Sequence, residues 1–88
     1  VLDAGALAAL RKGKSLLPAG IKNVTGDFSK GACVSVLNED SQEVARGMAA
    51  YSARDIVLIK GLPSERIEEC LGFRGPDEVI HRNDLVLI

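Results

Sequence analysis

The tripeptide Gly13-Lys14-Ser15 has the residue types of a site for phosphate chemistry. In a nucleotide-binding P-loop, another glycine stands five positions before the Gly-Lys pair, and the loop joins a strand to a helix. The corresponding position here is Ala8, which falls within a helical pattern. The spacing therefore argues against a nucleotide-binding loop.

A second interpretation treats the same segment as a contact for RNA phosphates. Arg11, Lys12 and Lys14 surround Gly13, where another backbone can approach closely, and Ser15 adds a hydroxyl. Positive side chains in such a place can hold a phosphodiester. The alternative is that these charges complement the negative end of a helix dipole. Both interpretations remain open at this stage.

The distribution of charge limits any RNA site to the first third of the chain. Residues 1–31 carry five basic and two acidic residues, with Lys22 and Lys30 as further candidates for RNA contact, whereas residues 32–88 carry six basic and ten acidic residues. The net charge is −1, and only Phe28, Tyr51 and Phe73 could stack on bases. This composition favours the dipole interpretation.

Other reactive residue types have no partners at useful spacing. His81 stands among polar neighbours with no nucleophile nearby, which favours a turn histidine over a catalytic one. Glu65, Glu68 and Glu69 lack a histidine or aspartate at ligand spacing, so they predict a solvated helix face. We expect no catalytic residue and no metal site.

The two cysteines, Cys33 and Cys70, have no CxxC spacing, and a structural zinc site is not predicted because the chain has a single histidine. A disulfide between them is possible. Two buried free thiols are favoured, because cysteine is so often buried. That pattern points to the cytoplasm.

The elements that must position these residues follow from hydrophobic spacing and turn signals. The predicted order is a helix, strands, two short helices and further strands. We expect helices at 4–12 (capped by Asp3), 53–60 and 64–71, and strand-like segments at 21–24, 32–37, 43–50, 78–80 and 85–88. Gly47 predicts a bulge or a close approach of backbones.

This order predicts an α+β fold with a small, mostly antiparallel, barrel-like sheet and short helices. The aromatic content of 3% requires an aliphatic core. The predicted core consists of Leu7, Leu10, Val34, Val36, Ile67, Leu71, Val79, Val86 and Ile88.

The length of 88 residues predicts one domain over 1–88. No basic segment precedes an apolar one as in a signal peptide, and no apolar run approaches the ~20 residues that span a bilayer. The chain starts at Val1 without an initiator methionine. We therefore expect a piece of a longer cytoplasmic chain.

Several segments together resemble the C-terminal PUA domain of the glutamate 5-kinase family, and the similarity covers nearly the whole chain. The most specific are Gly13-Lys14-Ser15-Leu16-Leu17-Pro18-Ala19-Gly20-Ile21 and Glu78-Val79-Ile80-His81-Arg82; weaker ones are Leu2-Asp3-Ala4-Gly5-Ala6, Gly26-Asp27-Phe28, Ala45-Arg46-Gly47 and Tyr51-Ser52. Two departures are Ala32 after Lys30-Gly31, where an aspartate is common, and the order Asn83-Asp84.

The resemblance implies a PUA fold, a pseudobarrel of about six strands with short helices. It also implies a parent enzyme in which an amino-acid-kinase domain, using ATP and magnesium, phosphorylates the side-chain carboxylate of glutamate for proline synthesis. Those sites belong to the kinase domain, so this chain is expected to hold no cofactor.

Two roles follow from the resemblance. The first is an accessory domain that packs on the kinase domain and tunes its oligomeric state or feedback response. The second is a module for structured RNA, because PUA domains that bind RNA use the first helix and the loop after it. On this sequence that surface is Arg11, Lys12, Gly13, Lys14 and Ser15, with Lys22 and Lys30 as neighbours.

Overall fold

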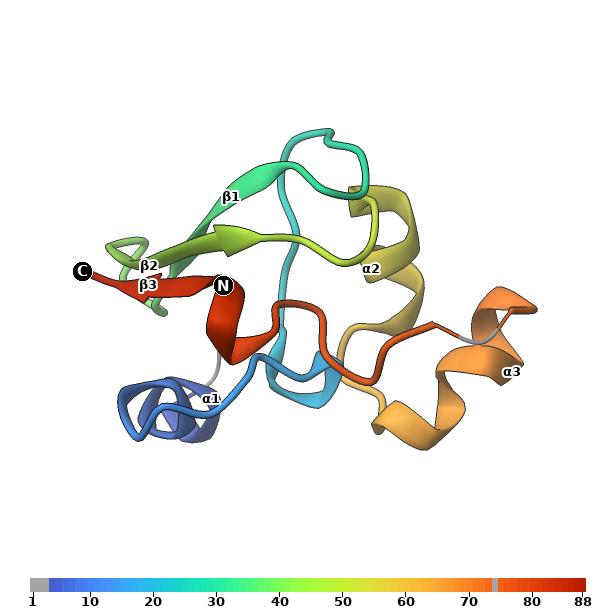
Figure 1. Cartoon of the computed structure of the whole chain (residues 1–88), viewed down its shortest axis with the longest axis horizontal. Helices are drawn as coiled ribbons and strands as arrows, with labels where there is room; N and C mark the ends of the chain where they lie inside the picture. Colours follow the sequence, from blue (N-terminus) through green and yellow to red (C-terminus); the bar gives the residue numbers. More distant parts are fainter. Residues whose placement is uncertain (1–3, 74) are drawn as a thin grey trace.

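The first helix, α1 (Ala4–Arg11), opens the part of the chain that the computed structural model describes, residues 4–73 and 75–88 (Figure 1). Its alanine-rich sequence favours a helix, and Leu10, with 1% of its surface exposed, anchors it to the core. The predicted first helix is confirmed. Its predicted cap, Asp3, lies outside the described residues.

The sheet contains β1 (Cys33–Leu37), β2 (Glu43–Met48) and β3 (Leu85–Leu87), in the order β1-β2-β3 with both pairs antiparallel. The predicted hairpin over β1 and β2 is confirmed, with an irregularity in its register between Val36 and Leu37. Among the described residues this sheet is open. The fold is therefore the predicted mostly antiparallel α+β type, with three named strands in place of the six that the resemblance implied.

Two segments predicted as strands are not strands. Residues 78–80 contribute only an isolated antiparallel bridge between Leu16 and Ile80. Ile21 has an extended backbone, but residues 21–24 form none of the named strands. Apolar β-branched residues favour extended backbone in both places, but a strand also requires a neighbour whose hydrogen-bonding groups run alongside it. Both expectations were wrong in that respect.

Two further α-helices and three 3₁₀ turns complete the elements of the described residues. They are α2 (Ala53–Ile59), α3 (Ile67–Leu71) and the 3₁₀ turns η1 (Pro18–Gly20), η2 (Ser64–Arg66) and η3 (Arg82–Asp84). The two predicted short helices are confirmed, the second as η2 running into α3. None of the helices in the described ranges is long and apolar enough to cross a membrane.

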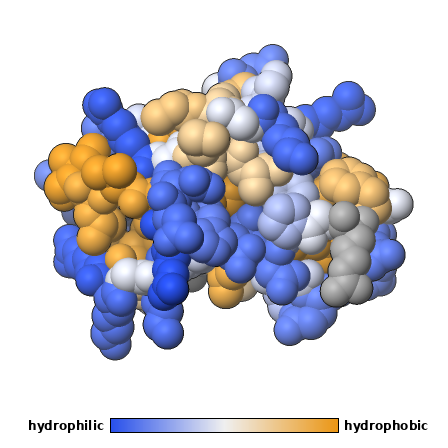
Figure 2. Space-filling model, viewed as in Figure 1, coloured by the Kyte–Doolittle hydropathy of each residue, from blue (hydrophilic) through white to orange (hydrophobic). Residues whose placement is uncertain are grey.

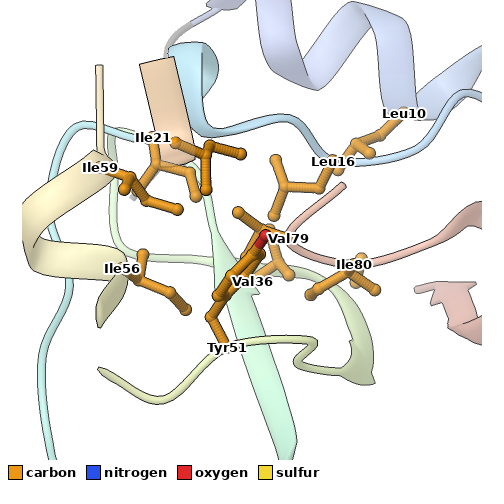
Figure 3. Packing of buried hydrophobic residues seen from close by; sticks show 11 residues of the cluster. Leu10, Leu16, Ile21, Val36, Tyr51, Ile56, Ile59, Val79 and Ile80 are labelled. Carbon is orange, nitrogen blue, oxygen red and sulfur yellow. The ribbon is translucent and has the colours of Figure 1, made fainter. Parts of the chain in front are cut away.

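The core lies between the inner face of the sheet, α2 and the segments around Leu16 and Ile80 (Figure 3). Among the predicted core residues, Leu10, Val36, Ile67 and Val79 are buried. Leu7, Val34 and Leu71 are half-buried.

Val86 and Ile88 were wrongly assigned to the core. They are 67% and 71% exposed. Only one face of this antiparallel sheet packs on the core. Side chains alternate between faces along a strand, which places these two on the outer face.

The prediction of two buried thiols was also wrong, because Cys33 and Cys70 are both exposed and both free. Cys33 begins β1 on the face opposite Val36, and Cys70 lies on the solvent side of the short helix α3. Burial of cysteine is a statistical tendency, and it does not override the side on which an element presents a residue. The two thiols form no disulfide.

Candidate functional site

The basic loop after α1 has a backbone that its own hydrogen bonds define. Gly13 has φ +81°, a left-handed conformation that glycine adopts without strain. The Gly13 N–H donates to the Leu10 carbonyl (3.0 Å) and the Lys14 N–H to the Ala9 carbonyl (3.1 Å), which is the Schellman arrangement of a helix end. The loop is therefore a fixed structure that holds Arg11, Lys12 and Lys14 exposed to solvent.

Hydrogen bonds from the C-terminal segment hold the other side of this loop. The Ser15 hydroxyl accepts from the Arg82 N–H at 2.8 Å. The Leu16 N–H donates to the Ile80 carbonyl (2.9 Å), and the Val79 N–H donates to the Leu16 carbonyl (2.8 Å). The Ser15 hydroxyl thus holds the backbone of η3 at Arg82 against the loop.

The structure groups five of the seven candidate residues for RNA contact. Arg11, Lys12, Gly13, Lys14 and Ser15 form one surface, which we call the basic loop. The backbone N–H of Arg82 contacts this loop through Ser15, a placement that sequence reasoning missed. Its place next to the loop follows from the hydrogen bond to Ser15, 67 residues earlier in the chain. A local sequence pattern cannot predict a contact between residues so far apart in the chain.

Lys22 and Lys30 lie in other parts of the molecule. The Lys22 ammonium forms an ion pair with Glu39 at 3.2 Å. The backbone carbonyl of Lys22 accepts a hydrogen bond from the Lys60 ammonium. The segment of Lys30 lies beside the end of β2, because the Gly31 N–H donates to the Ala49 carbonyl at 2.8 Å. Lys30 lines a hollow there, whose lining shares no residue with the hollow beside Lys14.

A hollow of about 490 Å³ separates α1 from the segment that follows the basic loop. Small apolar residues form most of its wall, and Lys14 and Ser15 supply its polar side chains. Leu17, 46% exposed, adds the largest apolar side chain. The lining is Gly5, Ala6, Ala9, Lys14, Ser15, Leu16, Leu17, Ala19 and Gly20. It could accept a flat or apolar group beside a phosphate.

The hollow beside Lys30 has a volume of about 250 Å³ and includes Tyr51 and Phe73. The Tyr51 hydroxyl donates to the Pro76 carbonyl. Burial, with added effect from Asp77, raises the pKa of Tyr51 above its usual value of 10.0, so the phenol stays protonated. Phe73 is 48% exposed, and its ring centre lies 6.5 Å from that of Tyr51. One aromatic face is therefore open to solvent here.

The remaining reactive residue types have structural roles. The His81 Nδ1 accepts from the Asn83 N–H at 3.1 Å, which confirms the predicted turn histidine. Glu65, Glu68 and Glu69 are exposed, and Glu69 pairs with Arg66 at 3.3 Å. No group of three His, Cys, Asp or Glu side chains that could hold a metal ion occurs within residues 4–73 and 75–88. Gly13-Lys14-Ser15 follows a helix and leads into extended chain, the reverse of a P-loop.

The sequence of this chain is similar to those of known proteins. The model of the PUA domain family matches residues 1–71. The chain is 54% identical to a glutamate 5-kinase of Brucella anthropi and 52% identical to one of Brucella ovis, each over 86 residues. These matches cover 98% of this chain but 23% of each kinase, so the chain spans about a quarter of their length.

A solved structure supports the same assignment of fold. The crystal structure of a PUA domain from Aeropyrum pernix, a tartrate complex, superposes with a TM-score of 0.65 at 26% sequence identity. The superposition covers 91% of this chain and 39% of that one.

Proposed function

The chain belongs to the PUA domain family, and from this premise we propose that it is the non-catalytic accessory domain of a glutamate 5-kinase. The observation that carries the proposal is the identity to glutamate 5-kinases, which extends along nearly the whole chain. Most of each kinase lies outside the matched region, which leaves room for a separate catalytic domain.

The proposal assigns catalysis to that other domain. In the parent, ATP would donate its γ-phosphate, with Mg²⁺, to the glutamate side chain in the first step of proline synthesis. Neither group fits the described residues, because phosphoryl transfer requires a phosphate cradle and oxygen ligands for the metal. Gly13-Lys14-Ser15 has the wrong connection for a cradle, and the exposed carboxylates of Glu65 and Glu69 do not converge on a metal site.

The role left to this domain is to pack on the kinase domain and tune its oligomeric state or its feedback response to proline. Interfaces between domains of one chain commonly allow such adjustment, because they are moderate in size and partly polar. A cytoplasmic location follows from the proposed place in amino-acid biosynthesis.

The test compares three proteins: the isolated chain, the full polypeptide that contains it, and that polypeptide without residues 1–88. We expect glutamate-dependent ATP turnover in the full polypeptide and in the truncated one, but none above a boiled control in the isolated chain. The truncated polypeptide should differ from the full one in oligomeric state or in inhibition by proline. Turnover by the isolated chain, or the absence of turnover in the full polypeptide, would refute the proposal.

A second candidate function, binding of structured RNA, has one observation in its favour. The basic loop is held in a fixed backbone conformation beside a hollow, with Arg82 next to it. Preformed loops of this kind bind phosphates with little loss of entropy. The dispersal of Lys22 and Lys30 and the net charge of −1 weigh against it.

A further inference from the structure

The sheet has an outer face that carries a cluster of exposed apolar side chains. Met48 is 52% exposed, Val86 67% and Ile88 71%. Strand register places them in a diagonal row. Val86 is opposite Arg46, so Met48 is its diagonal neighbour across β2, and the Ile88 N–H continues the ladder beyond Val86 by donating to the Val44 carbonyl at 2.9 Å. We define the outer face as Cys33, Ser35, Arg46, Met48, Val86 and Ile88.

The C-terminal end of β3 lies at a visible apolar patch. Figure 2 shows apolar surface gathered at the end of the molecule where Figure 1 places the C-terminal end of β3. Leu87, 46% exposed, extends the apolar surface around the edge of β3. Isolated exposed apolar residues are ordinary on protein surfaces, whereas these side chains lie next to one another.

The polar members of the outer face, Ser35 and Arg46, both bind the carboxylate of the neighbouring Glu43. The Arg46 guanidinium donates to both carboxylate oxygens of Glu43, at 2.8 and 3.0 Å, and the Ser35 hydroxyl donates to the same carboxylate at 2.5 Å. The bidentate pair leaves no unpaired charge beside Val86. Such a face is suited to an uncharged protein surface rather than to a polyanion.

We propose that the outer face of the sheet is the surface through which this domain docks on the kinase domain of the same polypeptide. This inference rests on the proposed function, since it assumes the covalently attached kinase domain. The order of strands leaves β3 at one edge, so the partner can contact Val86 and Ile88 without displacing any element of this domain.

The size of the face favours a tethered partner. Three strands ~4.8 Å apart, each contributing alternate residues at ~3.4 Å per residue, make a face of roughly 10 by 14 Å. Stable contacts between separate proteins bury about 800 Å² on each side, far more than this. A partner on the same chain needs less surface, because the tether raises its effective concentration to about millimolar.

Two other occupants make different demands. A second copy of the domain could add its own β3 to the free edge, but it would have to hold together without a tether. RNA would need unpaired positive charge, and Arg46 is already paired with Glu43. Both remain as outcomes of the experiment, and either would overturn the proposal.

The two free cysteines supply a matched pair of probes. Cys33 lies on the outer face and Cys70 on α3, and both are exposed. Alkylation with iodoacetamide, followed by peptide mass spectrometry, should modify both at similar rates in the isolated chain. In the full polypeptide we expect Cys33 to react about tenfold more slowly, while Cys70 changes by less than about twofold. Met48, the single methionine of this chain, should gain the same protection against peroxide.

Variants then test the apolar contact itself. Val86→Asp and Ile88→Asp should restore the reactivity of Cys33 in the full polypeptide. Leu58→Asp, which places the same charge at an exposed apolar site on α2, should not. All three should leave the melting temperature of the isolated chain within about 2 °C, because the replaced side chains are exposed.

The outcomes separate this proposal from the one on which it rests. If the full polypeptide shows no glutamate-dependent ATP turnover, the proposed function fails. If turnover is present and Cys33 reacts as fast as in the isolated chain, the docking face is wrong. Protection that increases with protein concentration would assign the face to a second copy, and protection only on addition of RNA would assign it to RNA. Protection that survives Val86→Asp would also contradict the proposal.

Discussion

Gly47 lies where β2 passes closest to the C-terminal segment. A methyl group added at this position would lie 2.6 Å from the Ile80 Cγ2 and 2.7 Å from the Asp84 carbonyl oxygen. The second atom belongs to the backbone of η3, which cannot move without disturbing the start of β3. The close approach predicted from the sequence is therefore real, although the irregularity of the sheet lies at Val36 and Leu37 instead.

We predict that Gly47→Ala destabilises the domain by about 1–3 kcal/mol, because the methyl group overpacks a tight contact. Urea denaturation of the isolated chain followed by circular dichroism measures this. Met48→Ala, at the next position on the exposed face, should change the free energy of unfolding by less than about 0.5 kcal/mol. Equal effects of the two substitutions would mean that the contact at Gly47 relaxes freely.

The carboxyl of Glu43 offers a test of the ion pair on the outer face. Its hydrogen bonds from Arg46, and then from Ser35, lower the pKa of Glu43 below 4.5. A lowered pKa in the folded state stabilises the protein above the pKa of the unfolded chain, and this contribution disappears as the pH falls through the folded value. The effect is therefore confined to acidic pH, below about 4.5.

We predict that Arg46→Gln raises the pKa of Glu43 toward 4.5, as followed by NMR titration of its side chain. The Ser35 hydroxyl should keep the value somewhat below that limit, since it still donates to the carboxylate. Lys22→Gln serves as the control, because Lys22 pairs with Glu39 instead. An unchanged pKa in Arg46→Gln would show that the guanidinium does not hold this carboxylate in solution.

At the scale of elements, α2 depends on one capping hydrogen bond. The Ser52 hydroxyl accepts from the Asp55 N–H at 3.2 Å, as the spacing of the two residues predicted. We predict that Ser52→Ala costs about 1 kcal/mol of stability, whereas Ser52→Asp, which keeps an acceptor, costs less. Thermal unfolding compares the two. An alanine variant as stable as the parent would mean that water replaces the cap.

Elements with local signals could be predicted from the sequence, and elements that depend on distant partners could not. A glycine ends α1, a polar turn joins β1 to β2, and Ser52 caps α2, so the residues that start or end each element are visible in the sequence. Whether residues 78–80 form a strand depends on Leu16, far away in the chain. Leu85-Val86-Leu87-Ile88 is apolar at every position, so no alternation distinguished its inner side chains from its outer ones.

At the scale of the whole molecule, the same limit applies to the candidate site. Arg11, Lys12 and Lys14 were found because they are neighbours in sequence around one helix end. Lys22 and Lys30 were included because they are basic and lie in the same third of the chain, but they occupy other parts of the molecule. Charge counted along a chain does not report charge on a surface, since folding disperses neighbours and brings together residues such as Ser15 and Arg82.

The distribution of basic residues leads to the last prediction, which concerns RNA. With Lys22 paired to Glu39 and Lys30 elsewhere, the basic loop offers Arg11, Lys12 and Lys14 with Arg82 beside them. We expect weak, non-specific binding of structured RNA. With three or four phosphates neutralised, the logarithm of the affinity should fall with the logarithm of the salt concentration with a slope of about −2 to −4.

A titration with tRNA at physiological salt, followed by fluorescence anisotropy, measures this affinity. The triple variant Arg11→Ala, Lys12→Ala, Lys14→Ala should abolish the residual binding without unfolding the domain, because all three side chains are exposed. Lys22→Ala with Lys30→Ala is the matched control, and it should leave the affinity and its salt slope nearly unchanged. Sub-micromolar affinity in the parent, lost in the triple variant and kept in the control, would instead identify the basic loop as an RNA site. The accessory role alone would then not account for the domain.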